Sequence, residues 1–321
     1  MKTKKTFFLF VGLFVVLSLV VFTGWGWGKS KKKQTFVMVP KLVHPYYEPC
    51  YEGFKDACEK FGIKPEFEAP AKGDLAVQVK VIEDLIVRGV DGIAISALED
   101  EGLISVVDEA VKAGIKVLMF DADAPSTKRL SYIGTDNEQA GFSAGKKVSE
   151  MLKGQSGDVV LLQGQLGATN LNLRAKGFRD ALAKYNPGLK VVAVEDIKSS
   201  LSGAMNKTEA VLSTYPNLKA IFGVSAYGAP GAAAVMKEQN KKGILVSGFD
   251  DLTETLNAIK SDLADFCIVQ KTYKMGWLSV ENLIDATKGK KIPEIIDTGV
   301  VFVEKSNVDT YMADMVKEIR K

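Results

Sequence analysis

Polar and aromatic side chains gather at the points where the predicted strands of this chain end. They follow three strands in the first half of the sequence and four in the second half. The residues are Lys41, His44, Tyr46, Tyr47, Ser96, Asp121, Asp123, Asn170, Asn172, Arg174, Ser225, Tyr227, Asp250 and Gln270. Carboxylates accept hydrogen bonds from hydroxyl groups, and Arg, Lys and Asn donate to them, so this mixture suits a neutral polyhydroxylated ligand. A tyrosine face can also pack on the apolar face of a sugar ring.

Several of these residues also have purely structural explanations. Asp121 and Asp250 could cap the segments that follow their strands. Tyr46 and Tyr47 could be core aromatics, although adjacent positions at a helix start point in different directions, so at least one should face a cleft. His44, which precedes a proline, could simply shape its loop.

Arg174 has a structural alternative as well, and three further residues are weaker candidates. Arg174 could pair with a surface acid, an interaction that contributes little to stability. Asp74, Asp136 and Asn137 are weaker ligand candidates. The pair Asp136–Asn137 lies where the first half of the chain passes into the second, so a hinge role fits it as well as ligand contact does.

Enzyme and metal signatures are missing from the sequence. It contains no phosphate-binding G-x-x-x-x-G-K-[ST] loop, and no G-x-S-x-G nucleophile turn follows a predicted strand. A glycosidase using Asp121 and Asp250 is the enzymatic alternative, but both acids fit better as acceptors for sugar hydroxyls. The single histidine excludes a histidine-rich metal site, and we expect no cofactor.

The three cysteines do not predict a disulfide. Cys50 and Cys58 fall on one predicted helix, about 12 Å apart at ~1.5 Å per residue, which is too far for a bond. We expect these two to be small buried hydrophobic residues.

Length and charge describe a chain with two different parts. Its 321 residues suggest about two domains of ~150 residues. Of 42 basic residues, seven are lysines within residues 1–34, which hold no acid, so the remainder carries 35 basic against 39 acidic residues. This acidic balance argues against nucleic acid as a partner, because such binding needs clustered cations.

The N-terminus predicts an export signal or a membrane anchor. Three lysines precede an apolar run from Phe7 to Phe22, and Trp25 and Trp27 could lie at a membrane interface. We assign residues 1–28 to a signal peptide or anchor, with the retained anchor favoured, and residues 29–34 to a basic linker. Either outcome places the body outside the cytoplasm, at the cell surface or in the periplasm.

From Thr35 onward, apolar strands alternate with amphipathic helices. The expected strands are Phe36–Val39, Ile63–Glu68, Gly92–Ser96, Lys116–Phe120, Ser131–Gly134, Asp158–Gln163, Val191–Glu195, Ala220–Val224, Ile244–Phe249, Phe266–Gln270 and Val300–Val303. The expected helices are Tyr47–Phe61, Leu75–Arg88, Leu103–Ala113, Gln139–Leu152, Asn172–Lys184, Met205–Tyr215, Ala229–Gln239, Thr253–Ser261, Tyr273–Lys288 and Asn307–Ile319. This alternation predicts an α/β fold of parallel βαβ units. A closed barrel could hold this many units, but polar strand ends in two separate halves favour two open sheets with a ligand between them.

Seven segments together resemble a known family. They are Val39–Tyr47, Phe120–Asp123, Tyr132–Asn137, Arg174–Phe178, Phe222–Tyr227, Gly248–Asp250 and Gln270. In this order, they make the stretch from Thr35 to Lys321 similar to the periplasmic sugar-binding proteins of the ribose-binding type, also called type I. The similarity is greatest to members that bind xylose or glucose.

The resemblance implies two Rossmann-like lobes joined by a hinge of three strands, which close on one monosaccharide without catalysis. The lobes would be residues 35–136 with 271–298, and 137–270 with 299–321. It implies that Asp121, Arg174, Asp250 and Gln270 hold sugar hydroxyls, that Tyr46 and Tyr47 stack on the ring, and that Lys41, His44 and Asn170 match positions used by xylose- and glucose-binding members. Ser96, Asp123, Asn137, Asn172, Ser225 and Tyr227 are secondary candidates.

Departures from the family pattern reduce the range of expected ligands but do not identify the partner protein. Ala122, Ser225 and His44 stand where the ribose binder has arginine, asparagine and asparagine, which argues against ribose. Autoinducer-2 receptors carry Asp-Gln where this chain has Asn170-Leu171, which argues against that ligand. The partner implied by the family is an ABC sugar permease or, in membrane-tethered members, the outer domain of a sensor histidine kinase that reports xylose.

Overall fold

The computed structural model describes residues 33–311. The predicted signal or anchor at 1–28, the linker up to residue 32 and the last part of the helix predicted at Asn307–Ile319 lie outside this range. Within residues 33–311, no helix combines the length and the apolar character needed to cross a membrane.

The described residues form two six-stranded sheets, and all strands of the first sheet are parallel. The strand order of this sheet is β11-β5-β4-β3-β1-β2. Its strands are β1 (Thr35–Val39), β2 (Lys64–Phe67), β3 (Gly92–Ile95), β4 (Lys116–Phe120), β5 (Tyr132–Gly134) and β11 (Ile295–Asp297). Its helices are α1 (Glu48–Phe61), α2 (Leu75–Arg88), α3 (Ile104–Lys112) and α9 (Thr272–Thr287), with short 3-10 turns at Pro45–Tyr47 and Glu101–Leu103.

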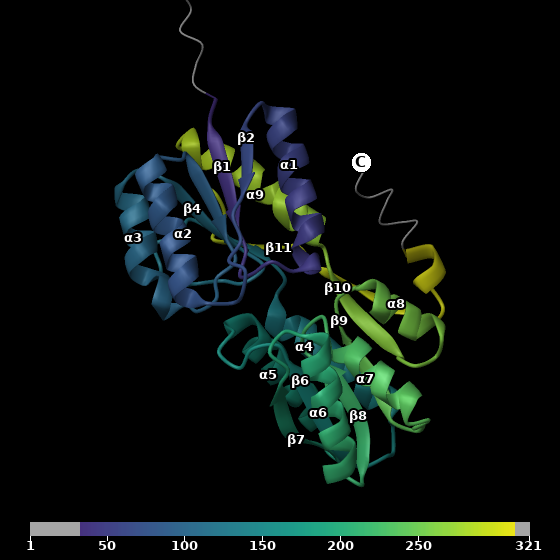
Figure 1. Ribbon diagram of the computed structural model, residues 1–321. Helices are drawn as coiled ribbons and strands as arrows, with labels where there is room; N and C mark the ends of the chain where they lie inside the picture. The colour runs from purple at the N-terminus through teal and green to yellow at the C-terminus, as the bar shows by residue number, and fades with distance from the viewer. Residues whose placement is uncertain (1–32, 312–321) are drawn as a thin grey trace, which may run out of the picture. The chain divides into compact units, whose positions relative to one another are not determined.

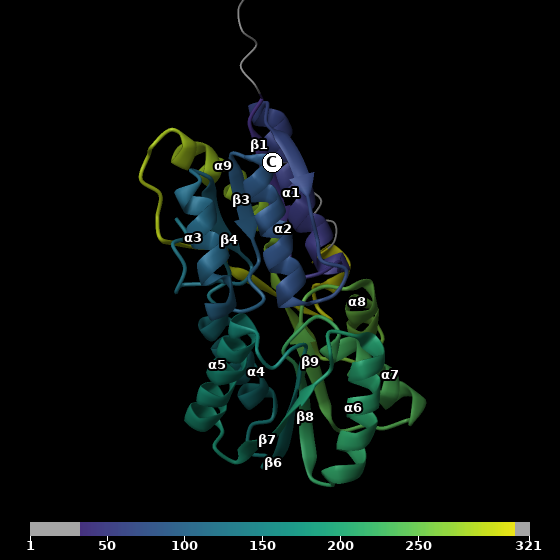
Figure 2. The ribbon, with the colours of Figure 1, turned by 60° about the vertical axis from the view of Figure 1, so that its left-hand side comes forward.

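Strand β1 explains why the first sheet is covered on both faces. Val37 and Val39 pack with residues of α2 and α3, whereas Phe36 and Met38 pack with residues of α1 and α9. All four are fully buried, so the strand needs apolar residues at consecutive positions. Figures 1 and 2 show α2 and α3 on one side of these strands and α1 and α9 on the other.

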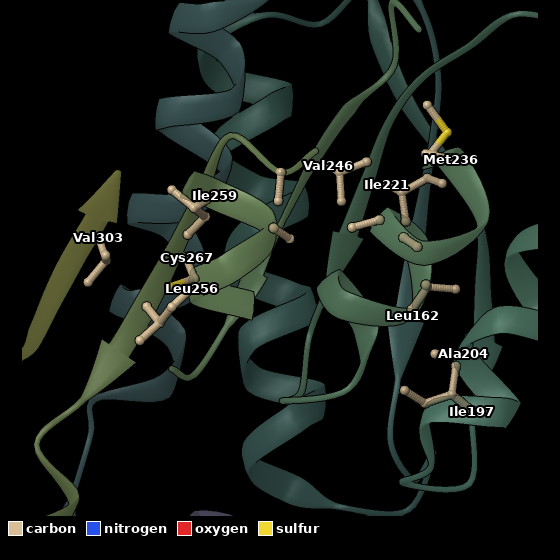
Figure 3. Close-up of a cluster of buried hydrophobic side chains, with 14 of the residues drawn as sticks. Leu162, Ile197, Ala204, Ile221, Met236, Val246, Leu256, Ile259, Cys267 and Val303 are labelled. Atoms are coloured by element: carbon tan, nitrogen blue, oxygen red, sulfur yellow. The ribbon is translucent and has the colours of Figure 1, made fainter. Parts of the chain in front are cut away.

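The second sheet has the order β12-β10-β9-β8-β6-β7, and β12 runs antiparallel to β10. Its strands are β6 (Gly157–Gln163), β7 (Leu189–Asp196), β8 (Leu218–Gly223), β9 (Leu245–Phe249), β10 (Phe266–Gln270) and β12 (Val300–Glu304). Its helices are α4 (Asn137–Met151), α5 (Thr169–Tyr185), α6 (Leu201–Thr214), α7 (Gly228–Glu238) and α8 (Thr253–Lys260). Figure 3 shows one of its two apolar clusters, in which Leu162, Ile221 and Val246 meet side chains of α6, α7 and α8 such as Ala204, Met236 and Ile259.

Within the described residues, the chain passes from one sheet to the other three times. The crossings are residues 135–136 between β5 and α4, residue 271 between β10 and α9, and residues 298–299 between β11 and β12. Two crossings are each hydrogen-bonded to the strand that leads into the other: Thr298 N donates to Gly134 O of β5 at 2.8 Å, and Asp136 N donates to Asp297 Oδ1 of β11 at 3.2 Å. The predicted fold class, two open α/β sheets joined by three strands, is confirmed.

Three local predictions differ from the structure. Strand β11 was missed, because it has only three residues and its Ile295 is 62% exposed, so it carries no apolar run. Helix α5 begins at Thr169 and not at Asn172, because its N-cap residue Ala168 has no side chain that could signal the start. Helix α6 begins at Leu201 and not at Met205. The cysteines behave as expected, because Cys50, Cys58 and Cys267 are free and buried.

Candidate functional site

The carboxyl ends of strands from both sheets surround one cavity. From the side of the first sheet it is lined by Lys41, Leu42, His44, Tyr46, Tyr47 and Asp121. From the side of the second sheet it is lined by Gln165, Ala168, Asn170, Leu171, Arg174, Ser199, Ser225, Ala226, Tyr227, Asp250 and Gln270. The structure therefore brings together every primary ligand candidate of the sequence analysis.

Asp121 follows β4 and lies at the centre of a hydrogen-bond network. Its carboxylate accepts from Tyr46 Oη at 2.9 Å, from Tyr47 Oη at 3.0 Å and from Ser96 Oγ at 2.6 Å. Asp121 is 3% exposed and has a backbone φ of 59°. This left-handed conformation is costly for a residue with a Cβ, and such strain often occurs at functional sites.

Asp250 occupies the equivalent position after β9 and has a φ of 69°. It accepts from Gln270 Nε2 at 2.9 Å. Burial raises the pKa of Asp250 to about 7, against the opposing effect of the Arg174 guanidinium. Among the hydrogen bonds of the described residues, neither Asp121 nor Asp250 caps a helix, so the capping alternative is wrong.

Arg174 enters the cavity from α5 and is only 1% exposed, so it is not a surface ion-pairing residue. Its Nε donates to Asn137 Oδ1 at 2.8 Å, and its Nη1 donates to Val224 O at 3.2 Å. The guanidinium carbon lies 4.1 Å from the centre of the Phe249 ring. Nη2 has no hydrogen-bond partner among residues 33–311.

Two more buried atoms on the cavity wall lack a hydrogen-bond partner in the described part of the chain. They are Ser225 Oγ and Gln270 Oε1. Buried polar atoms without a partner are rare in folded proteins, because each one costs about 1–3 kcal/mol. Together with Arg174 Nη2, they offer a bound molecule one charged donor, one hydroxyl and one amide oxygen.

Side chains on opposite sides of the cavity also touch each other directly. Lys41 Nζ donates to Asn170 Oδ1 at 2.9 Å, and the rings of His44 and Tyr227 meet edge to face with centroids 4.8 Å apart. Burial lowers the pKa of Lys41 to about 8, while Asp121 opposes this shift and Arg174 adds to it. These two contacts connect the first-sheet side of the cavity to the second-sheet side.

His44 shapes its loop and also lines the cavity. Its Nδ1 accepts from the backbone N–H of Tyr46 at 3.1 Å and so caps the 3-10 turn, while its ring lines the cavity. Burial lowers the pKa of His44, with Asp121 opposing. A neutral imidazole with its proton on Nε2 fits both observations.

The secondary candidates divide into two groups. Ser225 and Tyr227 line the cavity. Ser96, Asp123, Asn137 and Asn172 are not among the lining residues. Ser96 and Asn137 instead hydrogen-bond to lining residues, Asp121 and Arg174 respectively.

Other predicted residues have structural roles. Asp123 pairs with Arg129, and Asn172 accepts from Gln163 Nε2 at 2.8 Å. Asp74 caps α2 through Val77 N, and Asp136 caps α4 through Gln139 N. Among the described residues, no group of three His, Cys, Asp or Glu side chains could hold a metal ion.

Sequence reasoning missed two polar residues of the cavity wall. Gln165 lies in the loop after β6. This loop was expected to contribute ligand residues, but nothing in the sequence distinguished Gln165 from its neighbours. Ser199 follows β7, which ends at Asp196, and the sequence analysis took no candidate from the loop after this strand. A backbone φ of 47° at Ser199 could not be read from the sequence.

Comparisons with known proteins agree with this architecture. Residues 35–291 match the family described as "Periplasmic binding protein domain". The D-allose-binding periplasmic protein of Escherichia coli is 26% identical over 267 residues, covering 80% of this chain and 86% of that protein.

Two solved structures are similar over nearly their whole length. An ABC transporter solute-binding protein from Burkholderia graminis, in complex with D-arabinose, is 40% identical with a TM-score of 0.84, covering 88% of this chain and 99% of that one. The XylFII-LytSN complex contains a chain that is 30% identical with a TM-score of 0.80, covering 86% and 99%.

The named relatives are binding proteins and not enzymes, which sets the glycosidase alternative aside. The match covers most of the chain, the two-sheet fold agrees, and the cavity lies at the strand ends of both sheets. The chain belongs to the periplasmic binding protein family, as a type I sugar-binding protein of the ribose-binding group.

Proposed function

We propose that this protein is an extracytoplasmic receptor that binds one monosaccharide in the cavity, with D-xylose as the favoured ligand and glucose or another aldose as alternatives. The observation that carries the proposal concerns three side chains that line the same cavity, Arg174, Ser225 and Gln270. Each has a buried polar atom, Nη2, Oγ and Oε1 respectively, without a partner among the described residues. A sugar ring would supply the missing hydrogen bonds.

The charges around the cavity favour a neutral ligand. Two cations, Lys41 and Arg174, face two carboxyl groups, Asp121 and Asp250, and the remaining lining residues are uncharged when His44 is neutral. A charged ligand would leave this set unbalanced in a buried place, which is costly. Hydroxyl groups can instead donate to the carboxylates and accept from the two cations.

We assign closure of two lobes as the mechanism. The proposed lobes are residues 35–136 with 271–298, and residues 137–270 with 299–321, and the crossings between the sheets are the hinge. The Lys41–Asn170 hydrogen bond and the His44–Tyr227 ring contact support this mechanism, because both span the cavity. Sugar would bind the closed form more tightly and shift the population toward it.

Two partners fit a receptor that reports its closure. The structures of relatives include an ABC transporter solute-binding protein and the XylFII-LytSN complex. We propose that this chain either delivers sugar to an ABC permease or, held at the membrane by residues 1–28, signals to a sensor histidine kinase. Co-purification of the full chain with one or the other, in the presence of sugar, distinguishes the two.

A thermal-shift screen tests the proposed ligand class. We expect D-xylose to raise the melting temperature by several degrees at a hundredfold excess over Kd, because binding then adds about 2.7 kcal/mol of stability. D-Arabinose, D-glucose and D-galactose rank the alternatives, and D-ribose should give a smaller shift than D-xylose. A panel of pentoses and hexoses that leaves the melting temperature unchanged would contradict the proposal.

Sugar affinity should rise with pH between about 6 and about 8, because a donating hydroxyl prefers the ionised form of Asp250, whose pKa is about 7. The expected rise approaches tenfold, and titration calorimetry at several pH values measures it. The sugar-free protein should change in the opposite sense: a raised carboxyl pKa means that the folded state holds the proton longer, so this group destabilises the fold as pH rises from about 4 to about 7.

An Asp250→Asn variant is the matched control for this pH dependence. The charged groups that act on Asp250 are Arg174, Asp251 and Asp121. Because the pKa of Lys41 is about 8, we expect the rise in sugar affinity to end near pH 8. The variant should bind sugar with an affinity that no longer rises over this range. An unchanged pH dependence in Asp250→Asn would assign the titration to another group.

A further inference from the structure

Helices α4 and α5 pack so closely at Arg174 of α5 that their backbones are nearly in contact. A Cβ atom on Gly141 of α4 would lie 2.1 Å from the Arg174 carbonyl oxygen and 2.7 Å from its Cα. A Cβ on Gly177 of α5 would lie 2.0 Å from the Glu138 carbonyl oxygen. Real Cβ atoms do not come this close to backbone, so any side chain at Gly141 must push the main chain of Arg174 away.

The same helix also holds the side chain of Arg174. Asn137, the first residue of α4, accepts from Arg174 Nε at 2.8 Å. Its own Nδ2 donates to Thr135 O at 3.0 Å and to Tyr132 Oη at 3.2 Å. Thr135 belongs to the crossing between the sheets, so one short chain of hydrogen bonds leads from that crossing to the guanidinium.

We propose that α4 is the support that sets the position of Arg174, with Gly141 and Asn137 as positioning residues that do not touch the ligand. This inference rests on the proposed function, because it assigns Arg174 to sugar binding. Neither residue lines the cavity, and each contacts Arg174, Gly141 at its main chain and Asn137 at its Nε. Displacing the main chain of Arg174 would move Nη2 from its place, and hydrogen bonds weaken steeply with poor distance and angle.

A neighbouring glycine allows a matched comparison. Gly145 lies one turn further along α4, and a Cβ there would come 2.4 Å from Phe178 O and 2.9 Å from Ala181 Cβ. Phe178 and Ala181 are core residues that do not line the cavity. An alanine at Gly145 therefore disturbs the same helix pair without pressing directly on Arg174.

The test compares Gly141→Ala with Gly145→Ala in the full chain, by titration calorimetry with D-xylose and by thermal melting. Both variants should melt earlier than the wild type. Gly141→Ala should lower sugar affinity by about tenfold or more, whereas Gly145→Ala should change it by less than about threefold. Equal losses of affinity in the two variants would overturn the proposal, because general loosening of the helix pair would then explain both.

A second readout separates positioning from a structural role. In an Arg174→Lys background, Gly141→Ala should change affinity by less than about twofold, because the guanidinium that it positions is already gone. If Gly141→Ala does not fold, Asn137→Leu decides, since it adds no bulk at the glycine contact and should also lower affinity by about tenfold.

The outcomes also separate this inference from the proposed function. A wild-type chain that binds no sugar would refute both. Wild-type binding with unchanged affinity in Gly141→Ala or in Asn137→Leu would refute only the positioning role of α4.

Discussion

Replacing Arg174 with methionine should lower sugar affinity by about tenfold to a hundredfold, the largest effect expected of any single substitution in the cavity. A hydrogen bond from a charged group contributes about 1.5–3 kcal/mol, and every 1.4 kcal/mol is a factor of ten in affinity. Arg174 Nη2 is the one guanidinium nitrogen whose protein partner is missing among the described residues. Methionine keeps an unbranched apolar stem beside Phe249 but can donate nothing to a sugar.

Arg179→Met is the control for the Arg174 substitution. Arg179 lies on the same helix but is exposed, so its replacement should leave sugar affinity within about twofold of the wild type. Titration calorimetry on both variants, with melting curves to show that each is folded, measures the difference. If Arg174→Met binds sugar as well as Arg179→Met does, the assignment of Arg174 is wrong.

Asp250→Ala should lower sugar affinity at least tenfold. The carboxylate lies 5% exposed on the cavity wall and accepts a single hydrogen bond from the described residues, that of Gln270. It therefore has acceptor capacity left for hydroxyl groups, and losing a buried partner of a sugar hydroxyl costs about 1–3 kcal/mol.

The neighbouring carboxyl group offers a control. Asp251 accepts from Tyr311 Oη at 2.9 Å and is not among the residues that line the cavity. Asp251→Ala should keep sugar affinity within about threefold while lowering the melting temperature, because it breaks a partly buried hydrogen bond. A loss of affinity in Asp251→Ala as large as that in Asp250→Ala would show that the effect is indirect.

The two acids illustrate how far a pattern of residue types can lead. Asp121 and Asp250 were identified because each follows an apolar strand in a separate half of the chain, and the carboxyl ends of strands meet at one edge of an open sheet. The fold was predictable for a similar reason. Residues such as Gly62 and Gly89 mark helix ends, and in the structure both have the left-handed backbone that stops a helix.

The features that no pattern carried are those that depend on tertiary packing. The hydrogen bond from Lys41 to Asn170 joins residues 129 positions apart, and nothing in their local sequence indicates that they meet. Strand β11 has only three residues and is largely exposed. Its pairing with β5 defines it as a strand, and that pairing is not visible in its own residues. Ser199 lines the cavity from a loop in which its backbone has a left-handed conformation, and the residue type serine does not indicate this conformation.

The support of Arg174 by α4 belongs to the same class. Glycines at 141, 145 and 177 look alike in the sequence, and only the distances across the helix pair separate the one beneath Arg174 from the others. A buried arginine also cannot be told from an exposed one by its position on a helix, and Arg174 is among the largest fully buried side chains of the described residues.

Titration calorimetry of D-xylose into the full chain decides whether the cavity is a sugar site. We expect a saturable signal with one sugar bound per chain, an affinity that increases from about pH 6 to about pH 8, and a weakened affinity in Arg174→Met. Saturable binding of another aldose in place of D-xylose would support the proposed receptor function but assign it a different ligand. If the folded protein binds none of the pentoses and hexoses tested in the calorimeter, the proposed sugar-receptor function is wrong.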